Sequence, residues 1–71
     1  MIKKSMKIAG HSTSLALEPE YWVELEIIAR EEYCSVPQLI TRIDNMRVRS
    51  LASTIRLFVL AKAKDREQPQ F

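Results

Sequence analysis

One stretch of this chain alternates like a β-strand, and the patterns that follow it are helical. From residue 11 to 18, Thr13, Leu15 and Leu17 alternate with two serines and an alanine, which gives the strand one apolar face. A strand needs a neighbour for its backbone N–H and C=O groups. The neighbour expected from the sequence is the same strand of a second copy, paired antiparallel about a two-fold axis.

The small size of the chain also favours a partner. A fold of 71 residues buries little apolar surface, and folds of this size usually recruit a disulfide, a metal or another chain. Cys34 is the only cysteine and His11 the only histidine, so an internal disulfide and a His/Cys zinc site are both excluded. We therefore expect a homodimer, and we expect no metal and no cofactor.

Composition excludes several broad classes. With 46% hydrophobic residues and a net charge of only +2, the chain does not have the composition of a disordered protein. It contains no apolar run long enough for a membrane span or a signal peptide, so a cytoplasmic protein without membrane contact is expected. A single glycine, Gly10, argues against a phosphate-binding loop, which needs several.

The charges are unevenly distributed along the chain. The net charge is +3 over residues 1–17, −5 over residues 18–34, and +4 over residues 35–71. Two basic segments around an acidic one suggest a surface that faces a polyanion. Ordinary solvated faces explain the same distribution equally well.

Three helices are predicted, over residues 19–32, 36–46 and 51–64. Proline suits the first turn of the first helix, and Ser35 with Gln38 fits a capping box at the start of the second. Apolar residues recur in each helix at spacings of three and four. The chain is therefore mainly α-helical, with one N-terminal strand.

The third predicted helix is apolar over much of its circumference. Leu51, Ile55 and Phe58 form one stripe, while Leu57 and Leu60 lie elsewhere on the helix. Such a helix is difficult to bury within one small subunit. It gives a second reason to expect a dimer, or a higher oligomer formed through this helix.

The expected organisation is a basic arm over residues 1–10, one domain over 11–64, and a polar tail over 65–71. Met6 and Ile8 share the parity of the polar residues of the strand, so regular pairing should be interrupted at Gly10.

Three segments together resemble a known family. The segments are HSTSLALEPEYWVEL, SVPQLITRID and SLASTIRLFVL. In this order they are similar to the blocks of a bacterial subfamily of the ribbon-helix-helix (MetJ/Arc-like) DNA-binding proteins, which adds a third helix. The resemblance implies a homodimeric transcription regulator whose paired strands enter the major groove of double-stranded DNA.

The resemblance also implies roles for individual residues. Side chains on the outward strand face would contact bases, the start of the second helix would meet a phosphate, and N-terminal lysines, Lys3 among them, would follow the backbone. The residues so implied are Ser12, Ser14, Ala16, Ser35, Val36, Lys7 and Lys4. The expected core and dimer interface contains Thr13, Leu15, Leu17, Trp22, Leu39, Ile43 and Phe58.

The outward strand face differs from that of many relatives, which carry long basic or amide side chains there. Two serines and an alanine discriminate poorly among bases. An alternative function is therefore a protein-interaction module of the same fold, antitoxin-like or an adaptor, with weak or no sequence-specific DNA binding. In that case the acidic first helix and the third helix would bind the partner.

Enzymatic activity is not expected, because no nucleophile, base and orienting group occur together in a recognisable pattern. Cys34 is expected to be an inert apolar residue, and His11 the polar start of the strand. Arg56 lies within an apolar helix and should pair with a carboxylate such as Asp44. Arg42, Arg47 and Arg49 could contact phosphate or pair with the acidic first helix.

Overall fold

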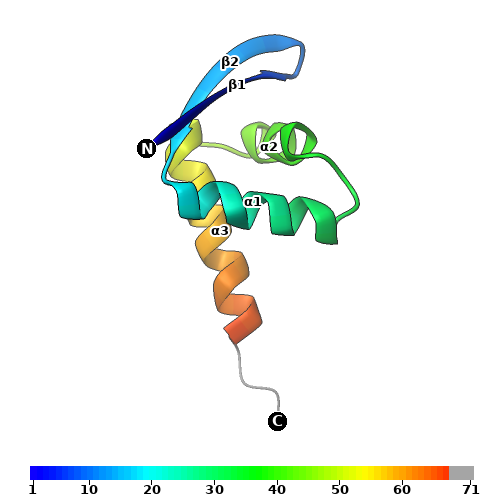
Figure 1. Cartoon of the computed structure of the whole chain (residues 1–71), viewed down its shortest axis with the longest axis vertical. Coiled ribbons are helices and arrows are strands. Elements are labelled where there is room, and N and C mark those ends of the chain that lie inside the picture. Colours follow the sequence, from blue (N-terminus) through cyan, green and yellow to red (C-terminus); the bar gives the residue numbers. More distant parts are fainter. Residues whose placement is uncertain (68–71) are drawn as a thin grey trace.

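The fold consists of a hairpin followed by three helices. The computed structural model describes residues 1–67. Its elements are β1 (Ile2–Ile8), β2 (His11–Leu17), α1 (Pro19–Glu31), α2 (Val36–Asn45) and α3 (Leu51–Glu67). The hairpin lies over α1 and α2, while α3 runs away from it, so the molecule is elongated at 45 × 24 × 23 Å (Figure 1). The predicted strand over residues 11–18 and the three predicted helices are confirmed, and β1 is an additional strand.

The two strands belong to the same chain and pair along their whole length. They are antiparallel, from Ile2 opposite Leu17 to Ile8 opposite His11. The two residues between them, Ala9 and Gly10, both have positive φ angles, of 52° and 83°. Two consecutive left-handed residues make a type I′ turn, whose twist matches that of paired strands.

One sequence-based expectation was wrong here. Residues 2–8 form a strand rather than a basic arm, and this strand, β1, pairs with β2 within the chain. Pairing of β2 with a second copy stays a prediction, for the edge of β2 that lies opposite β1. The parity change at Gly10 has a simple cause: a two-residue turn places even-numbered residues of β1 and odd-numbered residues of β2 on the same face. Met6 and Ile8 thus join Leu15 and Leu17 on the inner side.

Trp22 of α1 fastens β1 to the helices. Its indole Nε1 donates a hydrogen bond of 2.9 Å to the backbone oxygen of Ile2, and its side chain is 4% exposed. The Lys4 ammonium lies 5.0 Å from the centre of the same ring, a cation–π distance. One side chain therefore holds both the backbone and a lysine of β1.

A single core joins the hairpin to all three helices. Its central side chains, Leu17, Leu25, Ile40 and Ile55, are fully buried and come from β2, α1, α2 and α3 in turn. The complete buried set is Ile8, Leu15, Leu17, Trp22, Leu25, Ile28, Ala29, Leu39, Ile40, Ile43, Ile55 and Val59. The expected core residues lie within this set, except Thr13 and Phe58, which are half-buried.

Between α1 and α2 the chain reverses through a Schellman motif. The N–H of Cys34 donates to the oxygen of Ala29 at 2.9 Å, and that of Tyr33 donates to Arg30 at 3.2 Å. Tyr33 has a φ of 57°, a left-handed conformation that normally favours glycine, and its side chain is 97% exposed.

The predicted capping box of α2 is confirmed. Ser35 Oγ accepts a 3.2 Å hydrogen bond from the Gln38 N–H, and Gln38 Oε1 accepts a 2.8 Å bond from the Ser35 N–H. This reciprocal pair satisfies two backbone donors at the helix start. It fixes the point at which α2 begins beneath the hairpin.

Ion pairs between the acidic α1 region and basic residues of α3 hold α3 in place. Arg56 Nε and Nη2 donate to the Glu18 carboxylate at 3.0 and 2.9 Å, so the expected Asp44 partner was wrong. The other pairs are Lys62–Glu32 at 3.2 Å, Arg66–Glu24 at 3.0 Å and Arg66–Glu31 at 2.8 Å. The acidic segment thus neutralises a basic helix of its own chain.

The remaining part of α3 is exposed. Leu57 is 48% and Leu60 50% exposed on the side of the helix that faces away from the core. The helix continues through residues 65–67, which were expected in a polar tail; residues 68–71 of that tail lie outside the described part of the chain. Over residues 1–67, no helix has the length and apolar character needed to cross a membrane.

Replacing Trp22 tests the attachment of β1. Trp22→Phe keeps an aromatic ring but removes the hydrogen bond to Ile2, so the free energy of unfolding should fall by about 1–2 kcal/mol. Urea denaturation followed by circular dichroism measures this change. Val23→Ala, at a position of α1 that is 55% exposed, is the control and should stay within about 0.5 kcal/mol of wild type. Equal effects of the two substitutions would contradict the role given to Trp22.

The pairs of Glu32 make stability dependent on pH. Hydrogen bonds from Lys62 and then Arg42 lower the pKa of Glu32 below 4.5. A carboxylate whose pKa is lower in the folded state stabilises the fold above its unfolded pKa, and this stabilisation is lost as pH falls through the folded value.

We therefore expect the free energy of unfolding to decrease as the pH falls below about 4.5. Glu32→Gln should be less stable than wild type at pH 7 and should lose less stability on acidification. Lys62→Met removes the same pair from the other side and should act in the same direction. Denaturation at several pH values measures both, and an unchanged acid-dependent loss in Glu32→Gln would refute the assignment.

Candidate nucleic-acid interface

The outer side of the hairpin presents a small, polar and basic surface. Because side chains alternate along each strand, three residues of each strand point away from the helices. We call this surface the ribbon face, and it consists of Lys3, Ser5 and Lys7 from β1 with Ser12, Ser14 and Ala16 from β2.

The strand register places these side chains in three cross-strand pairs. Ser5 is opposite Ser14, and their hydroxyl oxygens are 3.1 Å apart, within hydrogen-bond distance. Lys3 is opposite Ala16, and Lys7 is opposite Ser12. A pair of hydroxyl groups therefore lies between two lysines, whose Cα atoms stand about 13 Å apart along the strand.

Helix α2 lies beneath the hairpin (Figure 1). Val36 and Pro37, at its start, line a pocket with Lys4 and Met6 of β1. Asp44, near its end, lines a second pocket with residues of β2. The ribbon face is thus flanked by the two ends of the same helix.

The pocket at the β1 edge contains two of the predicted contact residues. It has a volume of about 220 Å³ and brings Lys4 next to Val36, although Glu26 lines it as well. Lys4 lies on the inner side of β1 against Trp22, so it stands beside the ribbon face and not on it. The hydroxyl of Ser35 already accepts the capping hydrogen bond of α2.

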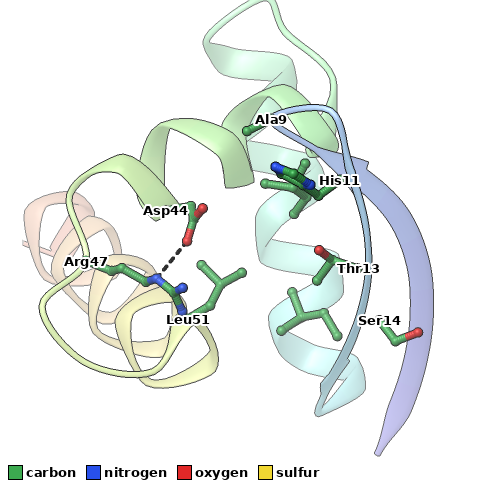
Figure 2. A pocket seen from close by; sticks show the side chains of 9 residues that line it. Ala9, His11, Thr13, Ser14, Asp44, Arg47 and Leu51 are labelled. Carbon is green, nitrogen blue, oxygen red and sulfur yellow. Dashed lines mark ion pairs between the residues drawn. The ribbon is translucent and has the colours of Figure 1, made fainter.

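The pocket at the β2 edge has a volume of about 300 Å³ and is shown in Figure 2. Arg47 Nε contacts Asp44 Oδ1 at 2.8 Å, on the side of the pocket opposite His11 and Thr13. Ser14 points to the other side of the strand, as expected for the ribbon face. Because the Arg47 guanidinium is paired with Asp44, the two charges of this pocket largely cancel.

Two basic residues near the end of α2, Arg42 and Arg47, form ion pairs within the chain. Arg42 Nη1 donates to Glu32 at 2.7 Å, as the pairing alternative predicted, while Arg47 pairs with Asp44. Within residues 1–67, no three His, Cys, Asp or Glu side chains are grouped closely enough to hold a metal ion. The chemistry that this surface offers is hydrogen bonding and attraction of anions.

Comparison with known proteins agrees with this architecture. A family model described as a ribbon-helix-helix domain matches residues 1–63. The chain belongs to the ribbon-helix-helix family. No significant match was found among curated proteins or among solved structures. The family is one of DNA-binding and regulatory proteins, and the match includes β1 as well as β2.

The placement of β1 changes the composition of the ribbon in this ribbon-helix-helix chain. Ser12, Ser14 and Ala16 all lie on the outer side, as their alternation predicted, and Lys7 lies beside them. Sequence reasoning did not place Lys3 or Ser5 on this face. A partial signal was present: Ile2, Met6 and Ile8 alternate with Lys3, Ser5 and Lys7, although Lys4 interrupts the apolar positions.

Proposed function

We propose that this chain binds double-stranded DNA with its ribbon face in the major groove and acts as a cytoplasmic transcription regulator. The observation that carries the proposal is the composition of the ribbon face, whose lysines and hydroxyls stand on a supported two-stranded ribbon. The major groove of B-DNA is wide enough to admit such a ribbon.

The two strands supply different kinds of contact. Lys3 and Lys7 of β1 carry long cationic side chains, which bind phosphate oxygens or the acceptor atoms of guanine. Ser12 and Ser14 of β2 offer short hydroxyls that accept or donate, and Ala16 can contact only a thymine methyl group. The affinity for DNA would therefore come mainly from β1, and the short side chains of β2 would let the strand approach the bases closely.

Contacts with DNA phosphates at the edge of the ribbon would favour the same orientation. The start of α2 lies at the β1 edge, and the free N–H groups and dipole of a helix start favour a phosphate. Val36 has an N–H to offer there, whereas Pro37 has none. Lys4, beside Val36, adds a positive charge to this edge.

Selection from a randomised duplex library at physiological salt tests the proposal. Recovery of a defined motif is expected, because the ribbon face carries both cationic and hydroxyl groups. Retention without a motif would limit the contacts to the DNA backbone. No retention of any duplex would refute the proposal.

The lysines of the ribbon face should control the salt dependence of binding. Lys3→Gln with Lys7→Gln should weaken binding to the selected duplex and reduce the slope of log affinity against log salt by about one for each phosphate that is no longer neutralised. Lys64→Gln, on the exposed side of α3, removes the same charge far from the ribbon and should leave the slope unchanged. Fluorescence anisotropy at several salt concentrations measures both; equal slopes would contradict the assignment.

We also propose that the chain forms a homodimer, joined through α3. The supporting observation is the pair Leu57 and Leu60, which are about half-exposed on the same side of this helix. Sedimentation at micromolar concentration should show a dimer, and Leu57→Lys with Leu60→Lys should convert it to a monomer with unchanged helical content. A wild-type monomer would refute the dimer.

A second candidate function is protein binding, antitoxin-like or as an adaptor, through the same exposed face of α3. The acidic segment contributes less than the sequence suggested, since Glu18, Glu24, Glu31 and Glu32 pair within the chain. Ala16→Glu distinguishes the two functions, because it places a negative charge on the ribbon face and none on α3. Loss of duplex binding favours the DNA-binding function.

A further inference from the structure

We infer that two copies of this chain form one DNA-binding sheet of four strands, in the order β1-β2-β2-β1. The two β2 strands lie side by side in the major groove, and the two β1 strands hold their lysines over the phosphates on either side. The inference rests on the proposed DNA binding and specifies which strand meets which part of the duplex. Within residues 1–67 the sheet contains β1 and β2 only, so each strand has one open edge.

The open edge of β2 presents backbone groups in a register that suits a second copy. The hydrogen bond of the two-residue turn joins Ile8 to His11, so the odd-numbered residues of β2 bond to β1. The N–H and C=O groups of Ser12, Ser14 and Ala16 therefore point to the open edge. Antiparallel pairing about a two-fold axis at Ser14 places Ser12 opposite Ala16 of the second copy and satisfies all three residues.

The amino acids at the two open edges favour pairing through β2 and oppose it through β1. Strand β2 contains no charged residue and no proline over residues 11–17, whereas edges that stay unpaired commonly carry lysine, as β1 does three times. In a symmetric pairing of two β1 strands about Ser5, Lys3 would lie opposite Lys7 of the second copy. Like charges directly opposite each other are destabilising, so the second copy is expected at β2.

The second copy would also cover the pocket beneath the open edge of β2. This pocket of about 300 Å³ is lined by Thr13, Leu15 and Leu51 among others (Figure 2). In the register centred on Ser14, Thr13 lies opposite Leu15 of the second copy, so the inner faces of the two hairpins are continuous. The edge contact belongs to the same homodimer as the contact through α3, because the hydrogen bonds of one strand edge offset only part of the cost of association.

The width of the four-stranded sheet determines how it sits on DNA. Neighbouring strands are about 4.8 Å apart, so the two β1 strands, three spacings apart, are separated by about 14 Å. The major groove is about 12 Å wide, which admits the central pair of strands and leaves the outer pair over its walls. Lys3 and Lys7 of each copy then meet phosphates, and the start of α2 lies on the same side of the hairpin. The residues left to face the bases are Ser12, Ser14 and Ala16.

Cross-linking tests the strand pairing without DNA. Ser14→Cys and Ser5→Cys are compared in a Cys34→Ala background, since these two serines lie opposite each other on one hairpin. The two Ser14 Cα atoms would be about 5.5 Å apart, within the range of a disulfide, whereas the two Ser5 positions would be about 14 Å apart. Mild oxidation should therefore link Ser14→Cys at least about tenfold faster. Equal rates in two variants of wild-type helical content would overturn the inference.

The recovered DNA motif separates base contacts from phosphate contacts. Selection is repeated at reduced salt with Lys3→Gln plus Lys7→Gln, and with Ser14→Asn. The lysine variant should recover the wild-type motif with affinity lowered about equally for all duplexes, because phosphates carry no sequence information. Ser14→Asn should change the centre of the motif, because asparagine pairs with adenine. A motif altered by the lysine substitutions, or unaltered by Ser14→Asn, would overturn the inference.

A titration of the selected duplex distinguishes this inference from the proposed function. The wild-type motif should have two-fold symmetry, and binding should saturate at two chains per duplex. Saturation at one chain per duplex would overturn the four-stranded sheet and leave DNA binding intact. Absence of duplex binding, together with rapid cross-linking of Ser14→Cys, would refute the proposed function and leave the pairing of the β2 strands intact.

Discussion

The packing of the inner face of the hairpin on α1 and α2 is the interaction on which the rest of the structure depends. A two-stranded hairpin alone is at best marginally stable in water. Here Ile8, Leu15 and Leu17 are removed from solvent, and Trp22 both packs against β1 and satisfies one of its backbone oxygens. With the inner face fixed in this way, the alternation of the strands determines which side chains point outward.

Electrostatics have a structural role at one end of the molecule and leave the other end free to attract anions. The acidic segment of residues 18–34, with its six glutamates, pairs with α3 through Arg56, Lys62 and Arg66. A backbone hydrogen bond and the Arg56 guanidinium lower the pKa of Glu18. Such exposed pairs are individually weak, but together they orient a helix that has little apolar contact beyond its first turns. Lys3 and Lys7 lie on the hairpin, opposite residues without charge.

Much of the fold was predictable from local patterns, and the exceptions have identifiable causes. The helix starts at Pro19 and Ser35 follow directly from proline and capping chemistry, and the alternation of β2 identified its outer face. Strand β1 was missed because its lysines suggested a solvated arm and because the turn at Gly10 reverses the parity of inward residues. The left-handed Tyr33 could not be predicted, since its conformation is imposed by the backbone hydrogen bonds that end α1.

The candidate surface was predicted only in part, because periodicity within one strand does not reveal which strand it pairs with. The residues of β2 on the ribbon face followed from strand periodicity alone, whereas Lys3 and Ser5 required knowledge of the pairing register. Long-range contacts such as Arg56 with Glu18 depend on how helices cross, which periodicity does not specify.

Closure of the ribbon within one chain has a consequence for how the protein responds to its own abundance. When strands from two copies must meet, the folded form disappears on dilution, and occupancy of a target rises steeply with protein concentration. A hairpin closed by a two-residue turn forms in a unimolecular step, so the fraction of chains carrying a finished ribbon is the same at nanomolar and micromolar levels. Only the association of folded chains with one another would then depend on protein concentration.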